Sequence, residues 1–199
     1  MGGIDHESEC WSQRYRYVAG VDEVGMGCLA GPVVAAAVVF ASASAIPAGI
    51  NDSKLLSSKK RAELDIRIRE SALAYAVAWA EVEEIDTINI YQAARLAMRR
   101  AVEQLNPRPD FLLIDGRGRV EIAIPQKSLI KGDTLSFSIG AASILAKVYR
   151  DNWMRSLDEK FPGYSFAKHK GYGSREHRLA LQSLGASPLH RKSFSWTPV

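Results

Sequence analysis

Two adjacent acidic residues, Asp22 and Glu23, lie where the apolar segment Val18 to Asp22 ends, directly before a glycine-rich stretch. Neighbouring side chains of a β-strand point to opposite faces of the sheet. If the segment is a buried strand, at least one carboxylate points into the interior, where an unpaired charge is costly. A cation would remove this cost, whereas the alternative interpretation is a solvated strand end followed by a glycine turn.

Short apolar segments with the pattern of β-strands recur along the chain, at residues 18–22, 33–40, 73–82, 111–115 and 122–130. A glycine-rich stretch that ends in Pro32 separates the first two, which predicts a hairpin with a tight turn. The last segment is the weakest, because Pro125 interrupts it.

Helices are expected from Ser57 or Ser58 to about Glu70, from Asp86 or Thr87 to Leu105, and from about Thr134 towards Leu157. A hydroxyl or carboxylate side chain can cap the first two of these helices at their starts. Strands mixed with crossing helices indicate the α/β class with a mixed sheet. A chain of 199 residues without repeats or a long linker fits a single domain.

Positive charge is concentrated near the C-terminal end of the chain. From Lys147 to Lys192 there are ten Lys/Arg against four Asp/Glu, although the whole chain has a net charge of only +4. This asymmetry indicates a surface for a polyanion. The charge alone is equally compatible with an ordinary solvated face.

The two cysteines, Cys10 and Cys28, have no CxxC or Cys/His spacing, so neither a disulfide framework nor a structural zinc site is indicated. The longest apolar run, Cys28 to Ala41, is too short to span a membrane, and the N-terminus has no basic start followed by an apolar stretch. We therefore expect a soluble, cytoplasmic protein with no membrane partner.

Further acids are candidates for the same site as Asp22 and Glu23. Asp115 ends an apolar strand, where active-site acids often lie in open sheets. Asp133 can instead be the N-cap of the long helix, and Asp151 can form a helix-surface pair with Arg155 or Lys147.

Clustered carboxylates without His or Cys are oxygen ligands that suit Mg²⁺ or Mn²⁺. A basic surface nearby favours metal-assisted attack of water on a phosphodiester. The residues by themselves therefore indicate a metal-dependent phosphodiester or nucleotide hydrolase.

The segment Gly20-Val-Asp-Glu-Val-Gly-Met-Gly-Cys-Leu-Ala-Gly-Pro-Val33 resembles the signature of type 2 ribonucleases H, the ribonuclease HII family. Further matches follow in the family's order: Asn51-Asp-Ser-Lys54, Leu113-Ile-Asp-Gly116, Lys131-Gly-Asp133, Ala141-Ala-Ser-Ile-Leu-Ala-Lys-Val148, Lys168-His-Lys-Gly-Tyr-Gly173 and His190-Arg-Lys-Ser-Phe194. The resemblance implies a ribonuclease H-like fold, with a mixed five-stranded sheet flanked by helices and a C-terminal helical segment. We expect this domain over residues 17–199, after an N-terminal extension at 1–16.

The resemblance also implies an endonuclease that hydrolyses the RNA strand of RNA–DNA hybrids. It would cut 5′ to ribonucleotides embedded in duplex DNA, leave 3′-hydroxyl and 5′-phosphate ends, and so remove misincorporated ribonucleotides and RNA primers. Its catalytic, metal-binding set would be Asp22, Glu23, Asp115 and Asp133, with Mg²⁺ or Mn²⁺. We expect a monomer that binds hybrids or ribonucleotide-containing DNA duplexes.

For substrate binding, the resemblance assigns the turn Gly25-Met26-Gly27 to the 2′-hydroxyl and phosphates of the ribonucleotide. It assigns Tyr172 to stacking at the RNA–DNA junction, a position where an ordinary, partly buried tyrosine is the alternative. Candidate phosphate contacts are Ser53, Lys54, Lys168, Lys170, Arg191 and Lys192.

Two residues depart from the family pattern, which usually has Arg at the position of Met26 and Pro at that of Cys28. Met26 lacks the forked donors of arginine, which puts affinity for the junction in question. Two alternatives remain: a nucleic-acid-binding protein that has lost activity, and a Mg²⁺-dependent hydrolase of free nucleotides.

Overall fold

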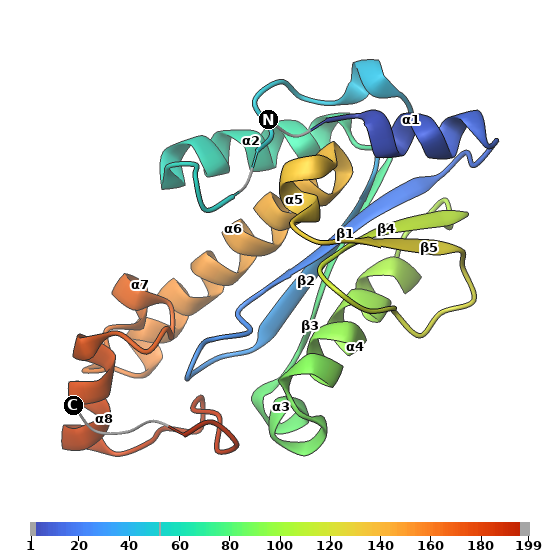
Figure 1. Cartoon of the computed structure of the whole chain (residues 1–199). Coiled ribbons are helices and arrows are strands. Elements are labelled where there is room, and N and C mark those ends of the chain that lie inside the picture. The colour runs from blue at the N-terminus through green and yellow to red at the C-terminus, as the bar shows by residue number, and fades with distance from the viewer. Residues whose placement is uncertain (1–2, 52, 196–199) are drawn as a thin grey trace.

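The computed structural model describes residues 3–51 and 53–195 (Figure 1). Its sheet has the spatial order β3-β2-β1-β4-β5, formed by β1 (Val18–Val24), β2 (Val33–Val39), β3 (Ala74–Ala80), β4 (Phe111–Asp115) and β5 (Gln126–Leu129). The first three strands are antiparallel along the chain, whereas β4 is parallel to β1 and β5 is parallel to β4. The expected mixed five-stranded sheet is therefore confirmed.

The helices are α1 (Asp5–Ser12), α2 (Ser58–Ser71), α3 (Val82–Ile88), α4 (Ile90–Glu103), α5 (Gly132–Leu135), α6 (Phe137–Lys160), α7 (Phe166–His169) and α8 (Arg175–Leu184). A short 3-10 turn, η1, covers Ala43–Ala45. None of the helices within the described ranges is long and apolar enough to cross a membrane.

Helices cover both faces of the sheet, so every residue of the interior strand β2 is buried. Alternate β2 side chains enter different cores. Ala35, Ala37 and Val39 pack with residues of α4 on one face. Val34, Ala36 and Val38 pack with residues of α2 and α6 on the other. The period of two in a strand thus explains why this segment is apolar throughout.

The N-terminal half of α6 packs closely against β1. A Cβ at Gly20 would lie 2.1 Å from the backbone carbon of Ser138, so this contact requires glycine. Ser136 caps α6 and receives a hydrogen bond from Ile139 N, and the buried Glu7 of α1 accepts from Ser136 Oγ (2.6 Å) and Ser138 N (2.9 Å). The predicted extension at residues 1–16 is thus tied to the start of the long helix.

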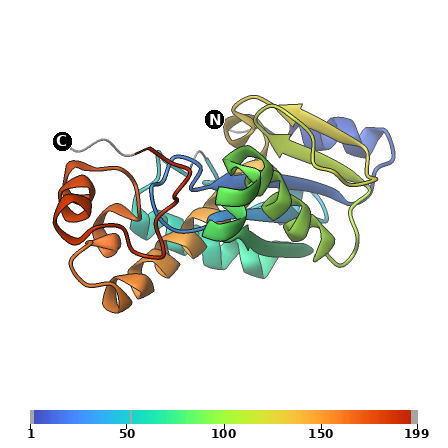
Figure 2. The same cartoon turned by 90° about the horizontal axis from the view of Figure 1, so that it is seen from below.

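Beyond the sheet, α6 continues into a C-terminal part made with α7, α8 and the segment after α8 (Figures 1 and 2). A separate apolar cluster joins this part to the connection that follows β1: Leu29, Ala30, Met154, Leu157, Tyr164, Phe166 and Leu181. Predictions that involve Asp52 and the last residues, 196–199, lie outside the described residues.

Several local predictions were wrong. The N-cap of α4 is Asn89, because Asp86 lies inside the preceding helix α3 and accepts hydrogen bonds from Lys192 N and Ser193 N instead. The connection between β1 and β2 is not a tight turn, since it runs from residue 25 to residue 32. Ser57 does cap α2, as one of the two expected residues.

Candidate active site

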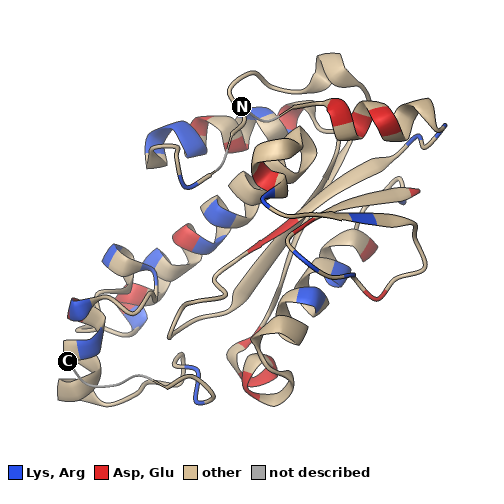
Figure 3. Cartoon of the chain, in the orientation of Figure 1, with Lys and Arg blue, Asp and Glu red and all other residues tan. Residues whose placement is uncertain are grey.

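Four acidic residues come from two adjacent parallel strands and a short helix. Asp22 and Glu23 end β1, and Asp115 ends β4 at the same level, since Val21 pairs with Ile114. Asp133 lies in α5, which is tied to β4 by a hydrogen bond from Gly132 N to Asp115 Oδ1 (2.6 Å). Figure 3 shows acidic positions on β1, within the sheet, and on the short helix α5.

Asp22 and Glu23 have raised pKa values, in part because of the charges of neighbouring acids. Burial, followed by the charges of Glu23 and Asp115, raises the pKa of Asp22 well above its ordinary range. The pKa of Glu23 rises to about 7, through burial and then the charges of Asp115 and Asp133, against the opposing effect of Lys54. The cluster therefore concentrates acidic groups whose charged forms are costly at Asp22 and Glu23.

Asp22 is buried, and its Oδ1 accepts a hydrogen bond from Glu23 N (2.7 Å). It also has a hydrogen bond with Ser143 of α6, whose hydroxyl lies 2.9 Å from the hydroxyl of the buried Ser53. Ser53 was predicted as a phosphate contact, but here it packs behind Asp22.

The chemistry of this donor set fits a hard divalent cation, because all four ligand candidates are carboxylates that would share its positive charge. Within residues 3–51 and 53–195, no three Asp, Glu, His or Cys side chains already converge as ligands of one ion.

Asp133 does not cap the long helix as the alternative prediction proposed, because Ser136 has that role. Asp151 pairs with Lys147, its Oδ1 lying 2.8 Å from Nζ, as one of the two expected partners. The pair is not on the helix surface, however, since Asp151 is 8% exposed. It belongs to α6 and is not among the charges that raise the pKa values of Asp22 and Glu23.

Two fully buried arginines hold the connection between β1 and β2. Arg150 of α6 donates to the carbonyl oxygens of Pro32 (2.9 Å), Ala30 (3.0 Å) and Lys170 (2.8 Å). A Cβ at Gly25, whose φ is +99°, would lie 2.4 Å from Arg150 Nε, so the guanidinium passes directly beneath the glycine. Sequence reasoning missed Arg150, because nothing in its local pattern distinguishes it from Arg155, the exposed arginine of α6.

Arg191 was predicted to contact phosphate, and the structure gives it a different position. It is fully buried, and its guanidinium donates to Met26 O (3.0 Å) and twice to Gly31 O (3.0 and 2.8 Å). Burial, followed by repulsion from Arg150, lowers its pKa to about 10, with Cys28 among the opposing causes. The side chain fixes the backbone of the predicted turn and is not exposed to a ligand.

Tyr172 lies beside the same connection. It forms an isolated β-bridge with Cys28 and is 40% exposed, with Lys147 Nζ 5.5 Å and Arg150 Cζ 6.0 Å from its ring centroid. Burial of part of the ring, and then Cys28, raise its pKa to about 12. An aromatic face with flanking cations is an arrangement that can stack on a nucleotide.

The lysines predicted to contact phosphate differ in their surroundings. Lys54 is exposed and close enough to the acids to lower the pKa of Glu23. Lys168 is exposed and paired with Glu176, and Lys170 is half-buried with its ammonium donating to a nearby backbone carbonyl. Lys192 is exposed, and its backbone N donates to Asp86 of α3. These side chains surround the site without converging on one point.

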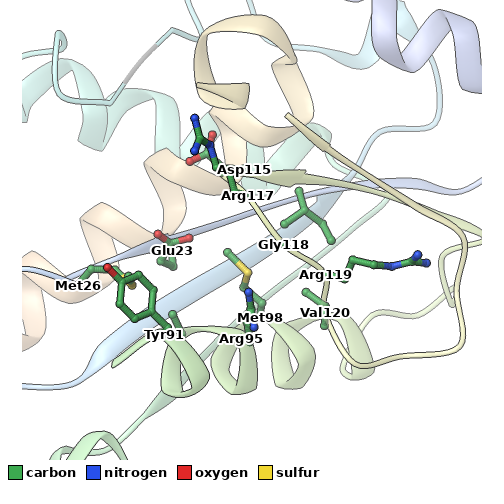
Figure 4. A pocket seen from close by; sticks show the side chains of 13 residues that line it. Glu23, Met26, Tyr91, Arg95, Met98, Asp115, Arg117, Gly118, Arg119 and Val120 are labelled. Carbon is green, nitrogen blue, oxygen red and sulfur yellow. The ribbon is translucent and has the colours of Figure 1, made fainter. Parts of the chain in front are cut away.

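A cavity of about 250 Å³ opens next to the acids (Figure 4). Glu23, Asp115 and Met26 line it, and Tyr91, Arg95 and Met98 project into it from α4. Further lining residues are Ala94, Ile114, Gly116, Arg117, Gly118, Arg119 and Val120. The sequence analysis did not identify these arginines, although Arg117 and Arg119 follow Asp115 closely in the chain.

Comparisons with known proteins agree over nearly the whole chain. The ribonuclease HII family model matches residues 19–197. Ribonuclease HII of Desulfitobacterium hafniense strain Y51 is 54% identical over 192 residues, which are 96% of this chain and 74% of the relative. A chain in the PCNA:RNase HII complex from Archaeoglobus fulgidus has a TM-score of 0.77 at 25% identity, with 91% of this chain and 96% of that chain covered. Bst-RNase HIII in complex with Mn²⁺ shares the fold, with a TM-score of 0.62 at 20% identity over 85% of this chain and 63% of that one.

Proposed function

The chain belongs to the ribonuclease HII family and is a ribonuclease H enzyme, and from this premise we propose that it cuts duplex DNA 5′ to an embedded ribonucleotide. The same site hydrolyses the RNA strand of RNA–DNA hybrids and leaves 3′-hydroxyl and 5′-phosphate ends. The observation that carries the proposal is the position of Asp22, Glu23, Asp115 and Asp133, whose charges act on one another beside an open cavity.

Mg²⁺ or Mn²⁺, held by these four acids, would activate water and neutralise the charge that develops on the phosphodiester. The protein contributes a rigid arrangement of the ligands. Asp115 is held by Gly132 N, and Asp22 by Glu23 N and Ser143, so at least one oxygen of each carboxylate has a fixed direction. Fixed ligands reduce the reorganisation that the reaction requires.

The connection from residue 25 to residue 32 supports recognition of the ribose. Its glycines leave backbone groups accessible to a 2′-hydroxyl, the group that distinguishes RNA from DNA. Arg150 and Arg191 bind five carbonyl groups from beneath, four of which belong to this connection or its end at Pro32. The backbone is therefore preorganised before the substrate arrives.

Tyr172 supports recognition of the neighbouring deoxynucleotide by stacking, and Lys54 supports binding of a phosphate near the acids. We further propose that Lys168, Lys170 and Lys192 contribute charge to the duplex-binding surface without base preference. The enzyme would act as a cytoplasmic monomer that removes misincorporated ribonucleotides and RNA primers.

The decisive experiment measures cleavage of a DNA duplex with one embedded ribonucleotide, with an all-DNA duplex as control. We expect a single cut 5′ to the ribonucleotide that requires Mg²⁺ or Mn²⁺. Glu23→Gln and Asp115→Asn should abolish turnover without unfolding the protein, whereas Glu159→Gln, an exposed acid on α6, should cleave normally.

Each proposed alternative gives a different result. Binding of the duplex without any cleavage would show a nucleic-acid-binding protein. Hydrolysis of free nucleotides with intact duplexes would show a nucleotide hydrolase. Normal turnover of Asp115→Asn would remove this residue from the metal-binding set.

A further inference from the structure

We propose that His177 and His190 form a buried, hydrogen-bonded chain of neutral rings, with the half-buried His169 stacked against it, and that this cluster positions Tyr172 for substrate binding. The three histidines lie in the C-terminal part and do not contact the four acids. They are positioning residues, because their action on the substrate would pass through Tyr172. The inference deepens the proposed function and rests on it only for the role of the tyrosine.

The directions of the hydrogen bonds fix the tautomer of His177. Its Nδ1 lies 2.9 Å from the carbonyl oxygen of Tyr172, which can only accept, so Nδ1 carries the hydrogen. Its Nε2 lies 3.0 Å from Nε2 of His190. In a neutral His177 this Nε2 is an acceptor, so the hydrogen between the two rings belongs to His190.

The assignment of His190 is supported independently from its other side. Its Nδ1 accepts a hydrogen bond from Ser187 N (2.9 Å), and a backbone N–H can only donate. His190 is therefore protonated on Nε2 alone, as the bond to His177 requires. The contacts at both ends therefore require the same two neutral tautomers. Each group from Ser187 N through His190 and His177 donates to the next, and the last hydrogen bond ends at Tyr172 O.

His169 completes the cluster by stacking on His177, with ring centroids 4.3 Å apart and an interplanar angle of 14°. Its Nδ1 accepts from Gly171 N (3.2 Å) and its Nε2 donates to Tyr164 O (2.7 Å). Two charged rings at this separation would repel each other, whereas neutral rings pack favourably.

The surroundings favour the neutral rings. His177 is fully buried and His190 nearly so, with the rings of Phe166 and Tyr164 against them. Burial is the largest cause that lowers the pKa of each histidine, to about 4 for His177.

Other charged groups act weakly on the cluster. Glu176 of α8 and Asp158 of α6 raise the pKa of His169, and Lys170 lowers it. His177 is affected by its two partner histidines and His190 by His169, with no carboxylate among their causes.

The histidine cluster contacts the backbone of the loop that carries Tyr172. His177 holds Tyr172 O and His169 holds Gly171 N, while Gly171 O accepts from Leu29 N (2.8 Å) on the inner side. The loop that carries the tyrosine is thus fixed between the histidines and the connection after β1. A second proton on His177 would enter at Nε2, place two N–H groups face to face and break the hydrogen bond to His190, while Nδ1 would still donate to the Tyr172 carbonyl.

Nitrogen NMR of the imidazoles tests the proposed tautomers. We expect Nδ1–H for His177 and Nε2–H for His169 and His190 at neutral pH, with His6 as the signal from outside the cluster. A doubly protonated His177, or an Nε2–H tautomer for it, would overturn the proposal.

Cleavage kinetics test whether the histidines position Tyr172. His177→Phe removes both hydrogen bonds, and His177→Asn keeps a donor near the position of Nδ1. We expect His177→Phe to raise KM for the junction duplex about threefold to tenfold, the effect of one net hydrogen bond, with little change in kcat. His177→Asn should recover most of this loss, and it also serves if the Phe variant folds poorly.

The same substitution in a Tyr172→Ala background separates positioning from general stability. If the histidine acts through the tyrosine, His177→Phe should raise KM no further there. The two outcomes that contradict the proposal are an equal rise of KM in both backgrounds and an unchanged KM in the folded His177→Phe protein. Loss of all duplex cleavage by wild type would instead refute the proposed function, while the NMR result would still stand.

Discussion

Replacing Arg150 by Met tests whether a buried guanidinium maintains the connection between β1 and β2. Arg150 is fully buried and donates to three carbonyl groups, those of Pro32, Ala30 and Lys170. Its hydrogen-bond partners in the described residues are these carbonyl groups and include no carboxylate, and the ring of Tyr172 lies 6.0 Å from its Cζ. Methionine fills a similar volume but offers no donor.

The expected magnitude follows from these contacts. Three hydrogen bonds from a charged donor, at roughly 1.5–3 kcal/mol each, give a gross loss of about 5–9 kcal/mol. Removal of the guanidinium also removes its desolvation penalty, which is several kcal/mol. We expect a net loss of about 3 kcal/mol in the free energy of unfolding, which lowers Tm by about 6–12 °C in a chain of this size.

Urea and thermal unfolding would measure this loss, with Arg155→Met on the exposed side of the same helix as the matched control. Arg150→Lys should fall between Met and wild type, because one ammonium cannot reach three carbonyl groups at once. Cleavage of the junction duplex by folded Arg150→Met should decrease about tenfold or more, since the backbone that contacts the ribose loses its fixed conformation.

The reasoning would be refuted if Arg150→Met unfolded within about 2 °C of wild type, the range of an ordinary surface substitution. It would also be refuted if the variant lost stability but cleaved the junction duplex with unchanged efficiency. In that case the connection would be structural and would not contact the ribose.

Three further predictions concern the site itself. The pKa of Glu23 is raised to about 7 from an ordinary 4.5, so the folded state binds this proton more tightly than the unfolded state. The free energy of unfolding of the metal-free protein should therefore fall by up to about 3 kcal/mol as pH rises from 4.5 to 7. Mn²⁺ should raise Tm more at pH 8 than at pH 5, and an equal rise would contradict the assignment of Glu23 as a metal ligand. Tyr172→Ala should lower the efficiency of junction cleavage about tenfold to a hundredfold, because stacking contributes roughly 1–3 kcal/mol, and Tyr172→Phe should lower it much less. Equal kinetics for Tyr172→Ala and wild type would show that the ring has only a structural role. Met26→Arg should tighten duplex binding by about 1–3 kcal/mol and steepen its salt dependence by about one counterion, and an unchanged salt slope would show that residue 26 does not face a phosphate.

Local patterns predicted much of the fold. Apolar runs bounded by glycine and proline predicted the strands. The acids near the ends of β1 and β4 predicted the end of the sheet at which the candidate site lies. The long helix was expected from its small residues, and Gly20 explains why they are needed, since α6 approaches β1 almost to backbone contact. These features depend on neighbours in sequence or on the size of a side chain, so the sequence contains them directly.

Local patterns failed where a polar side chain had more than one available partner. Asp86 was expected to cap a helix, but it accepts hydrogen bonds from the backbone of Lys192 and Ser193 more than a hundred positions later in the chain. Asp151 was expected on a surface and is buried beside Lys147. An Asx residue caps a helix or binds a distant loop with the same oxygens, so only the packed structure selects between them.

The sequence by itself indicated the family and the positions of the strands along the chain, and through the family resemblance it predicted four acids whose chemistry suits a divalent cation. Only the tertiary structure decided which of the basic groups are exposed and which are buried beneath the β1–β2 connection. Arginine is a residue type that often binds phosphate, yet Arg191 is buried, because its guanidinium donates to backbone carbonyls of the β1–β2 connection. The tautomers of His177 and His190 were likewise decided by distant backbone groups, because a hydrogen-bonded chain assigns each proton only when both of its ends are in place.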